Sequence, residues 1–509
     1  MARKTVLFND FRLLKPAFQK AGWEAKDELM STGGRLLTAG DKGRPRELEL
    51  NPGLRGWHRI VVGLCNPGKL ACGINLRVSG DAFGDFLQCS SYEDCVEELA
   101  FKSCDLTGRK LFIGHPAGWL TRLDYIKFIP VDKAPSRESR WNVGAMNDFY
   151  SYCYERAPRD PSAIAHCVAM HREAGFNIMY WQAAGAQCYY RTSVGTTVSG
   201  DVRPRTKYIA RLARRCDLLG LASEQSRKAG MAFYPWFRIN NEYGGMARTL
   251  KGVLSRYWIE HPQFRDVQRD GRKSPWHLSF AFPEVREHKV ALSKEMVSFG
   301  ADGILIDTQR HPPMTQYAAP AVRSFRDIYG EDPFRLPEND PRWLRHKASY
   351  FTEFMRQLRH EMAGSSHNLK IALRVSLHPA QCLKEGVDVE AIVAAGLVDV
   401  LMPSSHTYFN DFSLTPFRPL LRRATCELHG CINPYLPGAH DPGTKGTPFW
   451  GMQKAYYNMG EDGFASQARQ FHREGAAGVA FYESEAVISR SPIRAAIQGA
   501  SRLRPQGGR

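Results

Sequence analysis

One carboxylate at the end of a buried strand is the residue of this sequence best placed to do chemistry. Residues 304–306 are continuously apolar, and Asp307 follows them directly, with Arg310 and Pro312 in the loop behind it. Such an apolar run is typical of a parallel strand that is covered on both faces. Because α/β folds place their active sites at the carboxyl ends of these strands, we expect Asp307 to be catalytic.

The chemistry that suits Asp307 is glycoside hydrolysis, which uses two carboxyl groups on either side of the scissile bond. One of them is ionised and the other is protonated. We expect Asp307 to be the nucleophile or general base. Three glutamates compete for the role of general acid, namely Glu483, Glu485 and Glu242. The alternative for Asp307 is a structural role, such as anchoring a loop.

The positions just after the expected strands are rich in acidic, aromatic and imidazole side chains. Aromatic rings suit the faces of sugars, and neutral amides suit their hydroxyl groups. The side chains that we expect to bind substrate are Trp181, Trp236, Arg238, Asn241, Arg310, Arg374, His378, His406, Tyr408 and Tyr435. Asp148 and Tyr482 fall at the same end of the expected strands. For the two histidines, hydrogen bonding within loops is the alternative.

Helical and strand patterns alternate from Trp141 onward, and this alternation predicts the fold. Eight apolar strands are expected, each followed by a helix, at 142–146, 176–181, 231–236, 303–307, 370–375, 398–403, 430–434 and 478–483. Eight such units predict a (β/α)8 TIM barrel over residues 141–505. A doubly wound open sheet is the alternative, but no Gly-x-Gly-x-x-Gly motif follows the first strand.

Residues 1–135 have a different pattern, with short strands between turn signals. The runs at 59–64, 73–78, 110–113 and 123–130 predict an all-β sandwich or jelly roll that resembles carbohydrate-binding domains in general character. Trp57 and Trp119 could stack on sugars, although packing in the core or at its rim is the alternative reading. The charged, proline-containing segment 132–140 is the expected linker.

Composition limits the partners and cofactors. The sequence contains no run of 18 apolar residues, so it predicts no membrane span. No apolar signal-peptide core follows Met1, and we therefore expect a cytoplasmic protein. The 12 cysteines form no Cys-x-x-Cys motif and no His-Glu-x-x-His motif occurs, so neither a metal nor another cofactor is expected. The net charge of +17 is densest over 203–215, which predicts a solvated helix face or, alternatively, a surface for anionic ligands such as acidic glycans. No nucleic-acid motif accompanies it.

Three segments resemble the glycosyl-hydrolase-like family 10 proteins, which are bacterial (β/α)8 barrels. Residues 302–312 are similar to the family's "DGIHFDxxRYP" strand, and residues 396–403 to its "GLVDYLxP" segment. The stretch from His261 to Glu287 resembles the family's "HPEW…DGK…PEVR" segment. The resemblance implies a carbohydrate-active barrel with Asp307 in the family's presumed catalytic position and Arg310 beside it.

The sequence therefore predicts a glycoside hydrolase that cleaves an oligo- or polysaccharide, anionic glycans included, by a two-carboxylate mechanism. Two other functions stay open. One is a glycan-binding barrel without catalysis, in which the acid pair is incomplete. The other is a metal-dependent hydrolase that uses Asp307 with His378 and His406.

Overall fold

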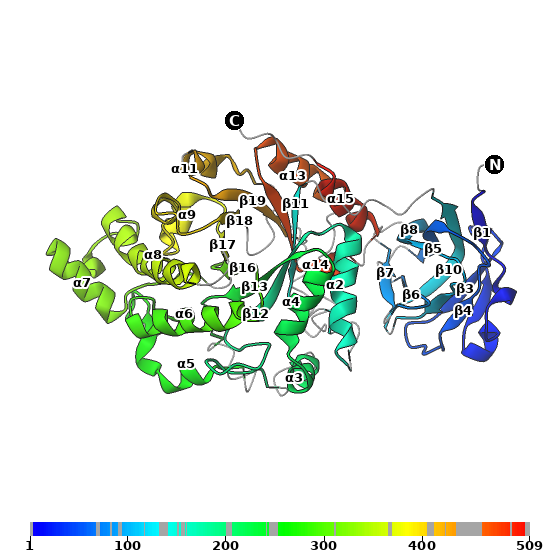
Figure 1. Ribbon diagram of the computed structural model, residues 1–509, viewed down its shortest axis with the longest axis horizontal. Helices are drawn as coiled ribbons and strands as arrows, with labels where there is room; N and C mark the ends of the chain where they lie inside the picture. The colour runs from blue at the N-terminus through cyan, green and yellow to red at the C-terminus, as the bar shows by residue number, and fades with distance from the viewer. Residues whose placement is uncertain are drawn as a thin grey trace.

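The computed structural model describes residues 4–503 apart from several segments. The segments that it leaves out are 68–71, 82–83, 90–93, 117, 132–140, 150–151, 154–157, 159, 200–205, 241, 244–252, 310–311, 365–368, 405–411, 423, 434–460 and 489–490. Figure 1 shows two bodies, with the first 130 residues beside a larger barrel.

Two antiparallel sheets form the N-terminal part of the molecule, as the sequence predicted. The first contains β1 (Val6–Phe8), β2 (Glu24–Asp27), β3 (Arg35–Ala39), β5 (Trp57–Pro67), β8 (Asp94–Asp105) and β10 (Thr121–Pro130). The second contains β4 (Leu48–Leu50), β6 (Gly73–Val78), β7 (Asp85–Gln88) and β9 (Leu111–Gly114). Short 3-10 helices lie at Phe11–Leu13 and Phe18–Ala21. One apolar core with side chains such as Trp23, Ile60 and Ile74 contains residues of both sheets.

The remainder of the chain forms a closed barrel of eight parallel strands, which confirms the predicted TIM barrel. In order around the barrel the strands are β11 (Asn142–Asn147), β12 (Ile178–Ala184), β13 (Ala232–Arg238), β16 (Gly303–Asp307), β17 (Lys370–Val375), β18 (Val400–Pro403), β19 (Glu427–Ile432) and β20 (Gly478–Tyr482). The last strand pairs with the first in parallel register, Asn142 opposite Gly478. The carboxyl ends of all eight strands therefore meet at one mouth.

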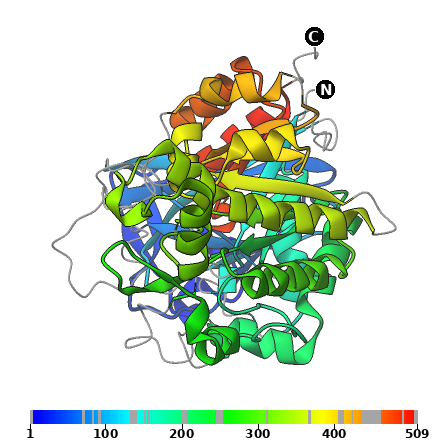
Figure 2. The same ribbon diagram turned by 90° about the vertical axis from the view of Figure 1, so that its left-hand side faces the viewer.

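Helices surround the barrel (Figure 2). They are α2 (Ser162–Ala174), α3 (Thr206–Arg215), α4 (Leu218–Lys228), α5 (Arg256–Glu260), α6 (Pro283–Val297), α7 (Ala319–Tyr329), α8 (Pro341–Ala363), α9 (Pro379–Lys384), α10 (Val389–Ala394), α11 (Arg418–Leu421), α13 (Glu461–Arg473), α14 (Ser484–Val487) and α15 (Ser491–Ser501). A hairpin of β14 (Arg265–Val267) and β15 (Lys273–Leu278) lies between β13 and α6. Among the described helices, none has the length and apolar character needed to cross a membrane.

Two predicted helices differ from the structure. The sequence pattern favours a single helix over 207–228. The structure has two helices there, because Asp217 begins a new one by accepting a hydrogen bond from the backbone N–H of Gly220. The sequence pattern also favours a helix over 416–428. In the structure this helix is short, and β19 begins at Glu427, three residues before the strand predicted at 430–434. The apolar run in the sequence covers only the second half of β19, so the start of the strand was not predicted.

Side chains of the barrel strands alternate between two apolar layers. Ile304 and Ile306 of β16 belong to the large core cluster shared with the surrounding helices. Leu305, between them, belongs to a smaller cluster with Met146, Trp236 and Tyr482 that fills the barrel interior. This two-residue period is inherent in a β-strand. It decides which side chains can reach the mouth.

Gly303 starts the strand that carries Asp307, and close packing explains why a glycine stands there. A Cβ atom on Gly303 would lie 2.3 Å from the carbonyl oxygen of Lys370 and 2.4 Å from the ring of Tyr234. Only a residue without a side chain lets β16 lie this close to its neighbours. The register that places Asp307 opposite Arg374 therefore depends on Gly303.

The two bodies are joined by buried polar contacts. Figure 1 shows α15 on the side of the barrel that faces the N-terminal sheets. Arg494 of α15 donates hydrogen bonds to the carbonyl oxygen of Phe101 in β8 and to that of Ile488. His166 of α2 lies 3.4 Å from Asp85 of β7. Burial alone would raise the pKa of Asp85, but the hydrogen bond from His166 and the charge of Arg494 outweigh it, and the pKa is lowered.

Replacing Arg494 tests this junction. The change Arg494→Met leaves the Phe101 carbonyl without its charged donor, and a hydrogen bond to a charged group contributes about 1.5–3 kcal/mol. We expect the free energy of unfolding, measured by urea denaturation, to fall by an amount of that order. Arg502→Met is the matched control, because Arg502 is exposed just beyond the same helix. Equal stability of the two variants would contradict the expectation.

Candidate active site

Asp307 is fully buried at the carboxyl end of β16 and accepts hydrogen bonds on both oxygens. Its Oδ2 lies 3.0 Å from Nη1 of Arg374 and 2.9 Å from the indole Nε1 of Trp236. Its Oδ1 accepts from the backbone N–H of Gln309 at 2.9 Å. A cation and two neutral donors therefore hold the Asp307 carboxyl group in one orientation.

Arg374 has the same buried position on β17 and extends the network to the next strand. Its Nη2 donates to Oγ of Ser404, just after β18, at 2.8 Å. Burial opposes the positive charge, but the Asp307 carboxylate outweighs it and raises the pKa of Arg374. Thr308 then donates to the Arg374 carbonyl at 2.8 Å. The ion pair thus holds the loop after β16 against β17.

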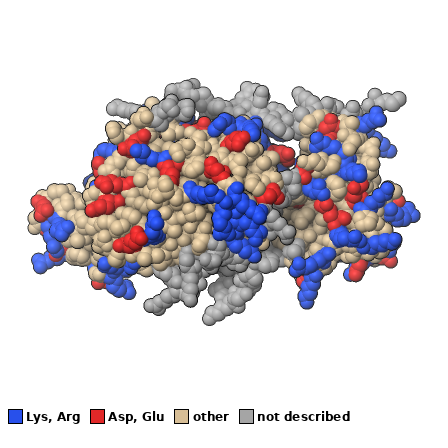
Figure 3. Space-filling model, turned by 60° about the horizontal axis from the view of Figure 1, so that its bottom comes forward, with Lys and Arg blue, Asp and Glu red and all other residues tan. Residues whose placement is uncertain are grey.

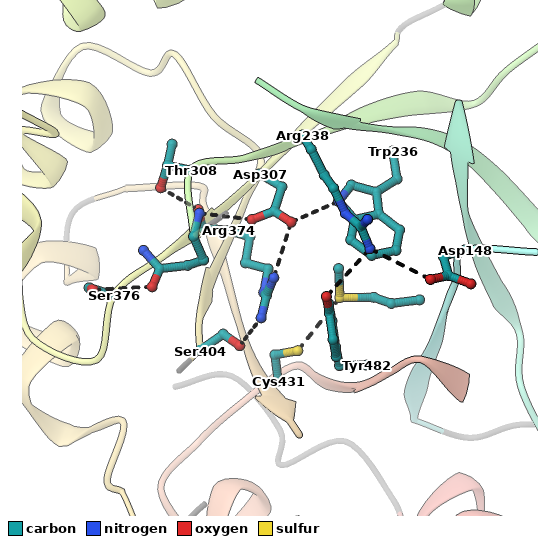
Figure 4. Close-up of polar contacts among 12 residues, drawn as sticks. Asp148, Trp236, Arg238, Asp307, Thr308, Arg374, Ser376, Ser404, Cys431 and Tyr482 are labelled. Carbon is teal, nitrogen blue, oxygen red and sulfur yellow. Dashed lines mark hydrogen bonds and ion pairs between the residues drawn. The ribbon is translucent and has the colours of Figure 1, made fainter. Parts of the chain in front are cut away.

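A second cation lies on the other side of Trp236. Figure 4 shows Arg238 beside the indole ring, with Asp307 on one side of them and Asp148 on the other. The guanidinium carbon of Arg238 is 4.4 Å from the centroid of the Trp236 ring. It reaches the hydroxyl of Tyr482 at 3.4 Å and Oδ2 of Asp148 at 3.8 Å. This arrangement separates two acidic positions within one mouth.

The second acidic position is a pair of carboxyl groups, Asp148 after β11 and Glu485 in α14. Glu485 is fully buried, and neither of its oxygens accepts a hydrogen bond from the described residues. Burial raises the pKa of Glu485 well above the usual carboxyl range, and the charge of Asp148 and a hydrogen bond with it raise it further. A protonated Glu485 that donates to Asp148 satisfies both observations. One proton is then shared by the pair.

The backbone at Glu483 turns the chain from β20 into the helix that carries Glu485. Glu483 has φ 46° and ψ 49°, a left-handed conformation that residues other than glycine rarely adopt. The hydroxyl of Ser484 lies 2.9 Å from His171 of α2, which fixes the start of α14. Strained residues of this kind gather at functional sites.

The structure brings together only part of the predicted site. Trp181 is fully buried on the helix side of the barrel wall, with its ring 4.7 Å from that of Phe149. Trp236 faces the interior, but it is also fully buried and holds Asp307 instead of presenting a platform for a sugar. His378 begins α9 with an exposed side chain. Predicted residues that lie outside the described part of the chain are Asn241, Arg310, His406, Tyr408 and Tyr435.

Glu242 has a partner of its own. It forms an ion pair at 2.6 Å with Lys289 of α6, and both side chains are almost fully buried. It also accepts a hydrogen bond from Ser255 at 3.2 Å. These contacts give Glu242 a structural role between α6 and the segment after β13.

Ser404 and Gln309 complete the site but were not singled out from the sequence. Ser404 follows the end of β18 directly, and Gln309 lies two residues after the end of β16, which is the signal that could have identified them. Among the residues described, no group of three or more histidine, cysteine, aspartate or glutamate side chains is arranged to hold a metal ion. The predicted combination with His406 involves a residue outside that part.

The family model described as Glycosyl hydrolase-like 10 matches residues 163–413. This region contains five of the eight barrel strands, namely β12, β13, β16, β17 and β18. The resemblance to that family is confirmed. Asp307, Arg238 and Arg374 lie inside the matched region, whereas Asp148 and Glu485 lie outside it. No curated protein sequence matches the chain.

Solved structures of glycosidases resemble the chain at low identity. A β-galactosidase from the psychrophilic Marinomonas ef1 has 12% identity and a TM-score of 0.45, covering 71% of this chain and 58% of its own. An α-galactosidase from Thermus thermophilus has 12% identity and a TM-score of 0.39, covering 95% and 99%. The glycoside hydrolase domain of PelA from Pseudomonas aeruginosa has 11% identity and a TM-score of 0.35, covering 69% and 98%. The chain thus spans less than two thirds of the length of the first.

The ion pair between Asp307 and Arg374 predicts strong coupling in a double-mutant cycle. Removing one partner leaves a buried charge uncompensated, which typically costs about 3–5 kcal/mol. We expect Arg374→Met and Asp307→Asn each to lower the free energy of unfolding. The double variant should lose less than the sum by about 1–3 kcal/mol. Chemical denaturation measures all four proteins, and additive losses would show that the pair is not coupled.

Proposed function

We propose that this protein is a glycoside hydrolase, with Asp307 acting at the anomeric centre and the Asp148–Glu485 pair supplying the proton. The observation that carries the proposal is that two acidic positions at one barrel mouth have opposite environments. Asp307 is surrounded by donors, and Glu485 by apolar surroundings and a second carboxylate. Glycosidases need one ionised and one protonated carboxyl group.

Asp307 suits the ionised role because its donors do not depend on a substrate. Arg374, Trp236 and the backbone of Gln309 hold the carboxylate in one orientation. As the bond from the anomeric carbon to the leaving oxygen breaks, this carboxylate would either bond to that carbon or take a proton from the attacking water. Preorganised donors require little rearrangement during either step.

The Asp148–Glu485 pair suits the protonated role. Its shared proton would move to the leaving oxygen, and the negative charge that remains would face Arg238, whose Nη2 lies 3.8 Å from Asp148. Asp148 is the more accessible member, at 4% exposure against 2% for Glu485. We therefore assign delivery of the proton to Asp148, with Glu485 as the group that keeps the proton on the pair.

A glycan-binding barrel without catalysis is the second candidate. The observation that favours it is that Asp307 is fully buried and both of its oxygens already accept hydrogen bonds. In that function Asp307 would only hold Trp236 and Arg374 in place. The two candidates differ in whether glycan is cleaved, and a screen of polysaccharides and chromogenic glycosides distinguishes them.

Conservative changes at the two acidic positions test catalysis. Asp307→Asn and Glu485→Gln keep the shape of each side chain but remove the base and the shared proton. We expect each to lower kcat by a factor of about 100 or more, since proton transfer by a placed group contributes about 10²–10⁴-fold. Glu427→Gln is the control, because Glu427 begins β19 at the opposite end of the barrel. Circular dichroism confirms that the variants are folded, and a folded Asp307→Asn variant with full activity would rule out the assignment.

The raised pKa of Glu485 predicts how stability and rate depend on pH. The folded protein keeps a proton that the unfolded chain releases, so the free energy of unfolding falls as pH rises from the ordinary carboxyl range through the raised pKa. We expect Glu485→Gln to flatten this loss and to remove the alkaline limb of the pH–rate profile. Denaturation and kinetics over a pH series measure both. An unchanged pH dependence of stability would show that Glu485 carries no such proton.

A further inference from the structure

An open cleft of about 750 Å³ lies beside the loop that follows Asp307. Its walls come from the turn of the β14–β15 hairpin, residues 313–317, the start of α8 and the end of α9. The side chains that matter for its chemistry are Gln268, Gln316, Tyr317, Asn339, Lys347 and Lys384. Its size is in the range of small-molecule binding sites, about 300–1,000 Å³.

Lys347 is the unusual side chain of this cleft. It is only 7% exposed, yet it has no hydrogen bond and no ion pair within 4 Å among the residues that the structure describes. Its Nζ lies 5.8 Å from the centroid of the Trp343 ring, so the aliphatic part of the side chain packs on α8. A buried ammonium group without an anion is costly, and an anionic ligand in the cleft would supply the missing partner.

The acidic residues of the cleft do not supply that anion. Asp270 forms an ion pair with Arg272 at 2.5 Å, and Glu338 lies 3.8 Å from Arg269. Arg269 is itself held by the carbonyl oxygens of Phe334 and Leu336. Lys384 lines the cleft with an exposed side chain and, like Lys347, has no ion pair within the described residues. Two lysines are therefore left for a ligand.

Asp266 is the acid with the largest electrostatic effect on Lys347, although the two side chains form no ion pair. Burial raises the pKa of Asp266 to about 7, and hydrogen bonds from the backbone N–H groups of Val267 and Gln316 and from the Ser279 side chain offset only part of this effect. Burial also lowers the pKa of Lys347, and the charges of Asp266 and Glu338 offset only part of this effect.

The neutral side chains indicate what accompanies the negative charge. Gln268, Gln316 and Asn339 offer amides that can both donate to and accept from hydroxyl groups. Tyr317 adds an aromatic ring to the wall. A ligand with hydroxyl groups and one carboxylate per unit matches this lining better than a compact inorganic anion. We propose that the cleft binds a uronic acid residue of an acidic glycan, with Lys347 and Lys384 pairing with its carboxylate.

The position of the cleft connects it to the candidate active site. Pro313, which lines the cleft, follows Asp307 by six residues, and its carbonyl accepts a hydrogen bond from Asn240 at 3.0 Å. Glu385, next to Lys384, accepts from Gln309 at 3.3 Å. The inference rests on the proposed function in one respect: it identifies the glycan that is cleaved as an acidic one.

Binding to matched charged and neutral sugars tests the proposal. The probes are tetragalacturonate, tetraguluronate and a hyaluronan tetrasaccharide, each with its methyl ester, in which the same backbone lacks the negative charge. Isothermal titration with the full chain should show binding of at least one acid form and a loss of about tenfold or more in affinity for its ester. No binding by any acid form, or equal affinity for acid and ester, would overturn the proposal.

Lysine variants locate the site. Lys347→Met and Lys384→Met should each weaken binding of the acid form, by about tenfold for Lys347, and leave binding of the ester unchanged. Arg345→Met is the control, because Arg345 is exposed on α8 two residues away and does not line the cleft. Lys347→Met removes a buried unpaired charge, so its melting temperature should equal or exceed that of the wild type. Unchanged affinity in folded Lys347→Met protein would overturn the assignment.

Failure of this site and failure of catalysis have different signatures. If Asp307→Asn binds the uronate as tightly as the wild type but neither protein cleaves any glycan, the assignment of the cleft is supported and the proposed hydrolase function is wrong. If neutral glycans are cleaved by the wild type but not by Asp307→Asn, and no uronate binds, the proposed hydrolase function is supported and the assignment of the cleft is wrong.

Discussion

The buried ion pair between Asp307 and Arg374 is the interaction on which the mouth of the barrel depends. It joins β16 to β17, and each partner then contacts one further strand end: Asp307 reaches Trp236 of β13, and Arg374 reaches Ser404 after β18. Four neighbouring strands are thus tied together at the level where chemistry would occur. A pair without solvent must satisfy its remaining donors and acceptors internally. That requirement explains why neutral donors and acceptors surround the two charges.

On the other side of Trp236, burial acts on a carboxyl group that has no ion pair within the described residues, whereas Asp307 has one at 3.0 Å. Burial raises the pKa of Glu485 well above the usual carboxyl range, and a second carboxyl group, in place of a cation, raises it further. Arg238 lies between the two regions, over the Trp236 ring and close to Asp148. Trp236 and Arg238 thus separate a carboxyl group that faces hydrogen-bond donors from one that faces a second carboxyl group. Both acids are almost fully buried, so they differ mainly in the groups that surround them.

The barrel could be predicted from the sequence because its signal is repetitive. Eight apolar runs with helical segments between them specify the fold even when single boundaries shift, as at β19 and at the break before Asp217. The site was less predictable. The positions of the strand ends indicated Asp307 and Arg374. At β12, however, the two-residue period of a strand indicates that Trp181 faces the helices and not the mouth. The pairing of Glu485 with Asp148 joins the first and last strands, and no local pattern reports contacts between such distant segments.

The contrast between Arg374 and Lys347 separates a structural charge from one that is available to a ligand. Arg374 is fully buried, but its guanidinium has a carboxylate at 3.0 Å and a hydroxyl at 2.8 Å. Lys347 is nearly as buried, it lines an open cleft, and its nearest acids either have cations of their own or lie out of reach of an ion pair. Folding alone gives no reason to keep such a charge, because an apolar side chain of similar size would stabilise the fold at least as well. A negatively charged ligand does give one, and the adjacent amides suit a ligand that also carries hydroxyl groups.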